Sequence, residues 1–209
     1  KTGDLIIAVN KKSTMNMELQ EVVSEIKKKE NKKVVLTIYR DKKSKDYTVK
    51  KSSVQLDTVS YKMKEKKIGY IAVSQFLENT GDQFDKAVTA LEKKGMRSLI
   101  IDLRDNGGGL LNTCTQMVSR VIDKDKLIVY TKDKEGNKEE FKSDSGKTLD
   151  IPIIILVNGN TASASEIMTG CLKDYGKATV VGTTTYGKGI VQNIMPLTDG
   201  SAIKFTIAK

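Results

Sequence analysis

The chain has 209 residues, a formal net charge of +10, 38% hydrophobic and 30% charged residues, and no histidine. The length is enough for one core or for a medium domain with a smaller companion, and the composition is that of a globular protein. The absence of histidine excludes a serine-histidine-acid triad, and Cys114 and Cys171 lack metal-ligand spacing, so no metal site is expected.

The first 50 residues have the pattern strand, helix, hairpin. We expect a short apolar strand over residues 4–10, an amphipathic helix over 15–29, and a half-buried strand over 33–40 that turns and pairs back over 47–51. So few strands cannot form a secure independent core, so this segment is expected to belong to a domain with further strands upstream. A polar connector follows and ends near Lys67.

Beyond Lys67, strands and helices alternate, which indicates an α/β layer architecture. The apolar run IPIIILV, residues 151–157, is expected to be the most buried strand, and the charged residues 133–147 to form an exposed hairpin or flap. The remaining strands are expected over residues 68–76, 98–104, 126–131, 178–183, 190–197 and 201–208, with helices over 81–95, 111–123 and up to about 175.

Lysine-rich runs over residues 27–33, 40–51 and 62–67 supply most of the positive charge. Clustered lysines release counterions from phosphates, which leaves a nucleic-acid interpretation open. The near absence of aromatic residues and of any binding motif favours a solvated surface that attracts acidic surfaces. No specific nucleic-acid partner is therefore expected.

The stretch TASASEIMTG, residues 161–170, joins the buried strand to a helix, and two interpretations of it remain open. Ser163 with Glu166 three residues later fits a capping box, which needs no catalysis. Alternatively, Ser163 exposes its hydroxyl beside the first-turn N–H groups, which are the donors that a tetrahedral oxyanion needs. Ser165 is a rival nucleophile.

Two glycine-containing loops complete the candidate chemistry. In IIDLRDNGGGLLN, Gly107 to Gly109 allow the backbone to approach a ligand closely, although a plain turn or a phosphate cradle fits as well; neither a dinucleotide fingerprint nor a P-loop is present. In TTTYGKGIVQN, Lys188 either stands exposed on a glycine turn or points inward. A lysine shielded from water is more readily neutral, and a neutral amine accepts a serine proton. Gln192 is placed to orient it.

In this order, with Lys188 25 residues after Ser163, the motifs DLRDNGGG, TASASEI and YGKGIVQ resemble those of the carboxyl-terminal processing proteases, also called tail-specific proteases. The N-terminal KTGDLIIAVNKKST, the following helix and VVLTIYR are similar to the second half of the PDZ domain of that family. The resemblance implies a partial PDZ domain over residues 1–52, a linker over 53–67, and over 68–209 a protease core of layered β/β/α, crotonase-like architecture, with the chain truncated at both ends.

The resemblance also implies roles for the site residues. Ser163 becomes the nucleophile, Lys188 the general base and Gln192 its positioning partner, while the backbone N–H groups of Ala164 and Gly108 bind the oxyanion; no metal or other cofactor is needed. The implied substrates are proteins with unstructured C-terminal tails, which the PDZ part recognises or gates.

The remaining implications concern setting. The family places the protein outside the bacterial cytoplasm, with a membrane anchor upstream and with a homo-oligomer or an activator protein as possible partners. The alternative from another class is a non-catalytic, PDZ-containing adaptor whose protease core serves only as a scaffold.

Overall fold

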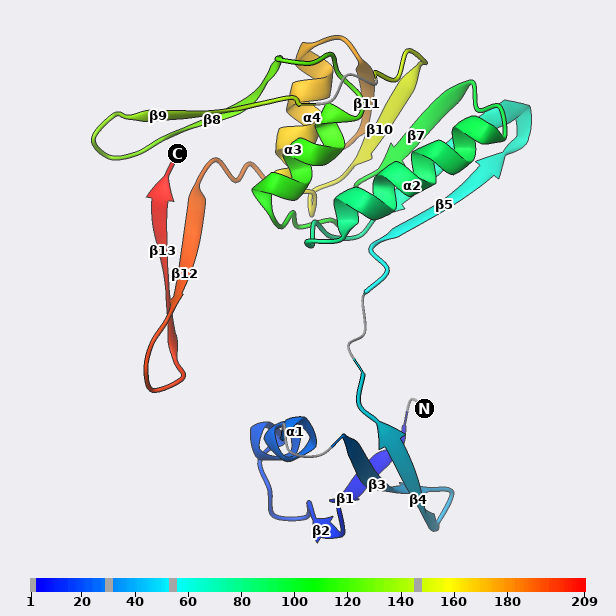
Figure 1. Cartoon of the computed structure of the whole chain (residues 1–209), viewed down its shortest axis with the longest axis vertical. Helices are drawn as coiled ribbons and strands as arrows, with labels where there is room; N and C mark the ends of the chain where they lie inside the picture. Colours follow the sequence, from blue (N-terminus) through cyan, green and yellow to red (C-terminus); the bar gives the residue numbers. More distant parts are fainter. Residues whose placement is uncertain (1–2, 29–31, 53–55, 145–147) are drawn as a thin grey trace. The chain divides into compact units, whose positions relative to one another are not determined.

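The computed structural model describes residues 3–28, 32–52, 56–144 and 148–209, and the chain divides into two compact units, Lys1–Gln55 and Leu56–Lys209 (Figure 1). Each unit has its own sheet.

The described part of the N-terminal unit is a small sheet with one helix beside it. The strand order is β2-β1-β3-β4, and its neighbouring strands run antiparallel. The helix begins later than expected, after a capping box made by Glu18 and Glu21, and Lys29 lies outside the described residues. The elements are β1 (Leu5–Val9), β2 (Lys12–Ser13), α1 (Leu19–Lys27), β3 (Lys33–Arg40) and β4 (Lys43–Lys50).

The second unit is built on a five-stranded sheet of order β11-β10-β7-β6-β5, in which β5 is antiparallel to β6 and the other pairs are parallel. The alternation of strands and helices along the chain confirms the α/β class. The elements of the sheet and its helices are β5 (Val59–Lys64), β6 (Ile68–Val73), α2 (Thr80–Lys93), β7 (Ser98–Asp102), α3 (Leu111–Ser119), β10 (Ile153–Val157), α4 (Ala164–Asp174) and β11 (Ala178–Gly182).

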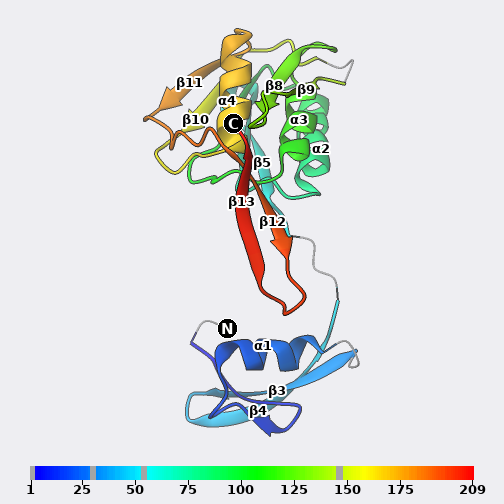
Figure 2. The same cartoon turned by 90° about the vertical axis from the view of Figure 1, so that its left-hand side faces the viewer.

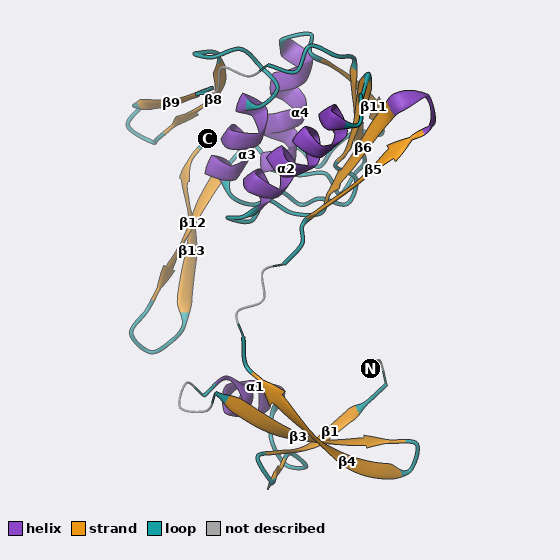
Figure 3. Ribbon diagram, turned by 45° about the vertical axis from the view of Figure 1, so that its right-hand side comes forward, coloured by secondary structure: helices purple, strands orange, loops and turns teal. Residues whose placement is uncertain are grey.

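The helices α2, α3 and α4 lie on the same face of this sheet (Figures 1 and 3). In α2 the buried side chains recur three or four positions apart, which is the spacing of one helix face. They pack with the buried side chains of β6, β7 and β10 in a single core. The largest fully buried members include Phe76, Phe84, Ile71, Leu91, Ile101, Met117, Ile155 and Met168.

Two expectations about this unit are wrong. The polar connector expected over 53–67 contains a strand, β5, because an edge strand needs only one apolar face and tolerates lysines on the other. The strand β10 is not the most buried one, because Ile154 is 38% exposed whereas β6 and β7 have no exposed residue; Ile153 and Ile155, on the opposite face, are covered by the helices. The apolar residues of β10 therefore lie in two different environments, the helix-covered face and the exposed face of the sheet.

Two hairpins extend from this unit. The charged flap forms one of them, β8 (Leu127–Lys132) with β9 (Lys138–Lys142), although residues 145–147 lie outside the described part. The other pairs β12 (Val191–Pro196) with β13 (Ala202–Ala208) and is a long ribbon in Figure 2. Lys132 and Lys209 exchange backbone hydrogen bonds of 2.9 Å, so the end of β13 meets the outer edge of β8.

None of the helices in the described ranges is long and apolar enough to cross a membrane.

Candidate active site

A cleft of about 990 Å³ brings together residues from three distant parts of the second unit. Its lining includes Ser163 and Ala164 from the start of α4, Gly108 from the loop after β7, and Lys188 and Gln192 from the segment that leads into β12. These are the five candidate site residues predicted from the sequence. The fold thus places side by side residues that are up to 84 positions apart, from 108 to 192.

Ser163 occupies a backbone conformation that β-carbons disfavour. Its φ of 57° and ψ of −120° lie in a region that few residues other than glycine adopt. Such strain persists only where the surrounding structure imposes it, and it is common at active sites, where a sharp turn between strand and helix exposes a nucleophile. The conformation turns the Ser163 residue into the cleft at the N-terminus of α4.

Glu166 joins the start of α4 to the loop that carries Lys188. The capping box is present, since Glu166 accepts the backbone N–H of Ser163 at 2.8 Å. The same carboxylate also accepts the backbone N–H groups of Lys188 at 2.9 Å and Gly187 at 2.6 Å, and the Thr185 hydroxyl at 2.8 Å. The capping and catalytic interpretations of TASASEI are therefore compatible, because one acid fixes the backbone of both candidate catalytic residues.

The hydrogen bonds to Glu166 favour its ionised form. Partial burial raises the pKa of this carboxyl, but the Thr185 hydroxyl and the three backbone N–H groups outweigh burial, and the net pKa is lowered from 4.5. A lowered folded-state pKa contributes stability that is fully present above the unfolded value and is lost as the pH falls through the folded value. Acid should therefore loosen the contact between α4 and the Lys188 loop.

Replacing Glu166 with glutamine is expected to lower peptidase activity about a hundredfold, because the amide has one acceptor oxygen where four donors converge. The loss should appear in kcat, since the substitution displaces Ser163 and Lys188 from each other and leaves the rest of the cleft intact. The matched control is Glu139→Gln on the exposed strand β9, which should leave kcat unchanged. Equal kcat for both variants would show that Glu166 does not position the pair.

The side chains of Ser163 and Lys188 share the cleft but are not hydrogen-bonded to each other in the described structure. The backbone N–H of Glu166 donates to the Ser163 carbonyl at 2.8 Å, and Ser163 is the N-cap residue of the helix. Lys188 is half-buried, and Gln192 on β12 lines the same cleft. Catalysis would require the Ser163 hydroxyl and the Lys188 amine to come within hydrogen-bond distance of each other.

The two expected oxyanion donors differ in whether their N–H group already has a hydrogen-bond acceptor. Ala164 N–H, the first of α4, has no acceptor among the described residues, so it is available to a ligand. Gly108 N–H donates to the side-chain oxygen of Asn106 at 2.9 Å, and Asn106 is itself fully buried. In this conformation the Gly108 donor is engaged, and it becomes available only if Asn106 releases it.

The glycine loop packs directly against the start of α4. Gly108 has φ +93°, and a β-carbon there would stand 2.6 Å from the Ala162 carbonyl oxygen and 2.8 Å from the Ser163 β-carbon. Asp105 links the glycine loop to the segment that precedes α4. Its carboxylate accepts hydrogen bonds from the side-chain amides of Asn158 and Asn160 at 2.9 and 2.8 Å. These bonds lower the pKa of Asp105 and keep it ionised.

The rival nucleophile is turned away from the cleft. Ser165 is fully buried, and its hydroxyl donates to the Asn106 carbonyl at 3.0 Å. Cys114 is also buried, and its thiol donates to the Ala164 carbonyl at 3.1 Å, while burial raises the pKa of both cysteines. Both cysteines thus behave as core residues.

No cluster of three metal-ligating side chains occurs within the described ranges.

Sequence patterns did not reveal the wider roles of Glu166, Asn106 and Asp105. Each was visible only as a local feature, a capping acid or a polar residue before glycines. Their hydrogen bonds join residues 2 to 59 positions apart in the chain, and those of Glu166 to the Lys188 loop link the two candidate catalytic residues. The one available signal was an acid at the third position of a helix that begins at a candidate nucleophile.

The family model described as peptidase family S41 matches residues 67–209. A "Probable CtpA-like serine protease" of Staphylococcus aureus (strain N315) is 41% identical over 208 residues, which are 99% of this chain and 42% of that protein. The "Carboxy-terminal processing protease CtpA" of Bacillus subtilis (strain 168) is 39% identical over 210 residues, 100% of this chain and 45% of that protein.

Among solved structures, the photosystem II D1 C-terminal processing protease superposes with a TM-score of 0.65 at 26% identity, over 99% of this chain and 58% of that one. The chain thus spans less than half the length of the two curated relatives and somewhat over half of this structure. The similarity extends through both units of the chain.

Proposed function

The chain belongs to peptidase family S41, and on that premise we propose that it is a serine endopeptidase in which Ser163 is the nucleophile and Lys188 the general base. The observation that supports this most directly is the cleft that both residues line, with Glu166 bonded to the backbone of each. Family membership, the strained backbone of Ser163 and the lack of histidine point to the same chemistry.

In the proposed mechanism the Ser163 hydroxyl attacks the carbonyl carbon of the scissile peptide bond while the neutral Lys188 amine accepts its proton. The oxyanion forms beside the free N–H of Ala164, with Gly108 as second donor once Asn106 releases it. Lys188 then returns the proton to the departing amine, and water hydrolyses the acyl-enzyme by the reverse proton path. Gln192 is assigned to orienting the Lys188 amine.

The proposed substrates are proteins with unstructured C-terminal tails. The cleft is lined by apolar side chains as well as by the site residues, among them Leu110, Leu111, Val129, Ile167 and Ile190. An extended chain with apolar residues fits this lining better than a charged one. The Bacillus subtilis relative is named a carboxy-terminal processing protease, which agrees with this substrate class.

We assign the N-terminal unit to the second half of a PDZ domain that tethers or gates the tail, joined by a linker to the protease core. We also propose that a second β layer of crotonase type covers the free face of the five-stranded sheet. The protein is proposed to act outside the cytoplasm, with a membrane anchor, a homo-oligomer or an activator protein as its partner. In the present state, Ser163 caps its helix and the Gly108 donor is engaged, so an adaptor without activity is the second candidate.

The function is tested with an unfolded reporter protein that ends in an apolar tail, compared with the same reporter ending in a charged tail. We expect the reporter with the apolar tail to be cleaved faster. The free apolar peptide should inhibit cleavage of that reporter and should not inhibit cleavage of the reporter with the charged tail. Peptide binding without any cleavage across the pH range would favour the adaptor instead.

A further inference from the structure

The positive charge of the N-terminal unit gathers at one end of its sheet. The exposed side chains there come from four segments that are separate in sequence, and Lys51 beside them is half-buried. We call this group the lysine ring; its members are Lys11, Lys12, Lys27, Lys28, Lys32, Lys33, Lys50 and Lys51.

Contacts around the ring show that these segments meet. On the strand side, Lys33 stands directly opposite Lys50 in the β3–β4 pair, and the Lys51 backbone N–H donates to the Lys32 carbonyl at 3.0 Å. The turn that carries Lys11 is fixed to the same end, because Asn10 N–H donates to the Val35 carbonyl at 2.8 Å.

The end of the helix closes the ring. Lys51 Nζ donates to the Lys28 carbonyl at 2.5 Å, which brings the C-terminus of α1 to the end of β4. Glu25 on α1 then pairs with Lys28 at 2.7 Å and with Lys12 at 3.9 Å. The β1–β2 turn, the two strand ends and the helix end therefore form one continuous surface.

Repulsion between the lysines of this surface lowers the folding stability of the N-terminal unit. Like charges directly opposite each other across two strands repel, and neither Lys33 nor Lys50 is in an ion pair with another described residue. Neighbouring side chains on paired strands lie within one Debye length at physiological salt, which is about 8 Å, so the ring acts as a single positive field. Like charges placed opposite each other on paired strands, without an ion pair to offset the repulsion, are typical of a functional surface.

We propose that the lysine ring binds the surface of a lipid bilayer that carries anionic headgroups. All eight members are lysines, which act as point charges, whereas bidentate recognition of single phosphates favours arginine. The ring has no aromatic member on which a nucleic-acid base could stack. A group of this size beside a bilayer is attracted to anionic lipids by the sum of its charges, without any shaped pocket.

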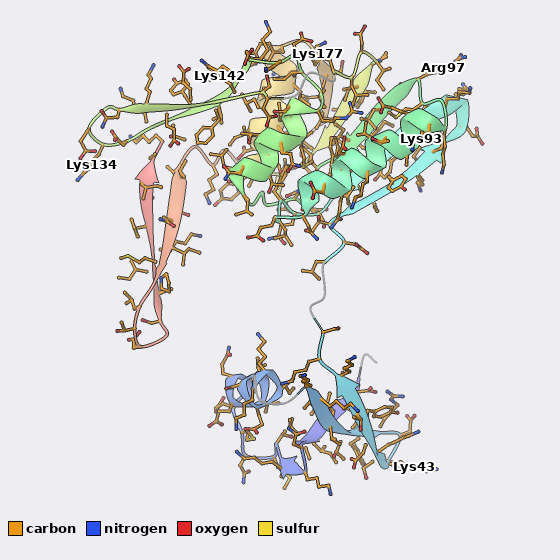
Figure 4. The ribbon with its side chains drawn as sticks, viewed as in Figure 1. Lys43, Lys93, Arg97, Lys134, Lys142 and Lys177 are labelled. Carbon is orange, nitrogen blue, oxygen red and sulfur yellow. The ribbon has the colours of Figure 1, made fainter. Side chains whose placement is uncertain are left out.

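The test compares two triple variants of the whole chain with equal net charge. The ring variant replaces Lys11, Lys32 and Lys33 with glutamine. The control variant replaces Lys42, Lys43 and Lys45, which surround the β3–β4 turn at the other end of the sheet, where Figure 4 labels Lys43. Binding is measured by cosedimentation with vesicles of phosphatidylcholine mixed with phosphatidylglycerol, and with vesicles of phosphatidylcholine alone.

We expect binding to the anionic vesicles only, weakening steeply with salt, and reduced by the ring variant about a hundredfold. The control variant should bind nearly as well as the unmodified chain. Melting temperatures should be equal or slightly higher for the ring variant, because it relieves the repulsion between Lys33 and Lys50.

Three results would overturn the proposal. Equal weakening by both triple variants would mean that net charge alone attracts the vesicles. Absence of binding to the anionic vesicles at low salt would remove the bilayer as partner. Tighter binding to duplex DNA than to vesicles at the same salt, lost in the ring variant, would assign the surface to nucleic acid.

Discussion

Alanine in place of Ser163 or Lys188 is expected to lower kcat/KM for a tailed substrate by at least about a thousandfold. In the proposed mechanism Ser163 supplies the attacking oxygen and Lys188 the acceptor for its proton, so each substitution removes one partner of the proton transfer. The double variant should be no slower than either single one, because the two residues act as a unit. Lys188→Arg should be equally inactive, since a guanidinium keeps its proton at any working pH.

Two controls separate loss of chemistry from loss of structure. Lys204 on β13 lines the same cleft, so Lys204→Ala changes the local charge as Lys188→Ala does but should retain activity. Ser165→Ala removes a buried hydrogen bond to Asn106 and should lower stability by about 1 kcal/mol while the remaining folded enzyme stays active. Activity that survives in Ser163→Ala but vanishes in Ser165→Ala would reverse the assignment of the nucleophile.

Gly108→Ala is expected to lower activity about a hundredfold and to destabilise the fold by about 1–3 kcal/mol. The added β-carbon would stand 2.6 Å from the Ala162 carbonyl oxygen and 2.9 Å from Ala164 N, at a φ of +93° that an alanine adopts with strain. The start of α4 and the Ala164 donor would have to move away. Activity and chemical denaturation measured on the same preparation would show both effects.

The adjacent Gly107 provides the matched control. A β-carbon at Gly107 meets no atom within 4 Å, and its φ is not positive, so Gly107→Ala should be close to neutral in activity and stability. Equal effects of the two substitutions would mean that the loop needs general flexibility, and that the close approach of Gly108 to the nucleophile is unimportant.

The sequence predicted best where burial and local motifs coincide. Strands β6 and β7 and helix α2 were expected within a few residues of their bounds, because their apolar residues recur with the period of one buried face. The candidate site was predictable because its members lie in short motifs whose glycines and spacing are informative by themselves. The structure then placed all five members in one cleft.

The sequence predicted least where a residue's role depends on distant partners. The polar residues of β5 gave no strand signal, since that strand is stabilised by pairing with β6 along the sheet edge. The exposed face of β10 was hidden within an apolar run, because hydrophobicity does not tell which side of a sheet carries helices. The hydrogen bond from Gly108 N–H to Asn106 depends on a side-chain rotamer, which no spacing rule fixes.

The left-handed backbone of Ser163 also has an evolutionary consequence. Glycine adopts a φ of 57° without strain and is nearly as good a helix cap as serine, so the chain would gain folding free energy by giving up its nucleophile. A substitution of Ser163 by glycine would therefore stabilise the fold and abolish the proposed function. A lineage that keeps serine here is under selection for what the hydroxyl does, and a homologue with glycine in its place would mark a branch that has been released from that selection.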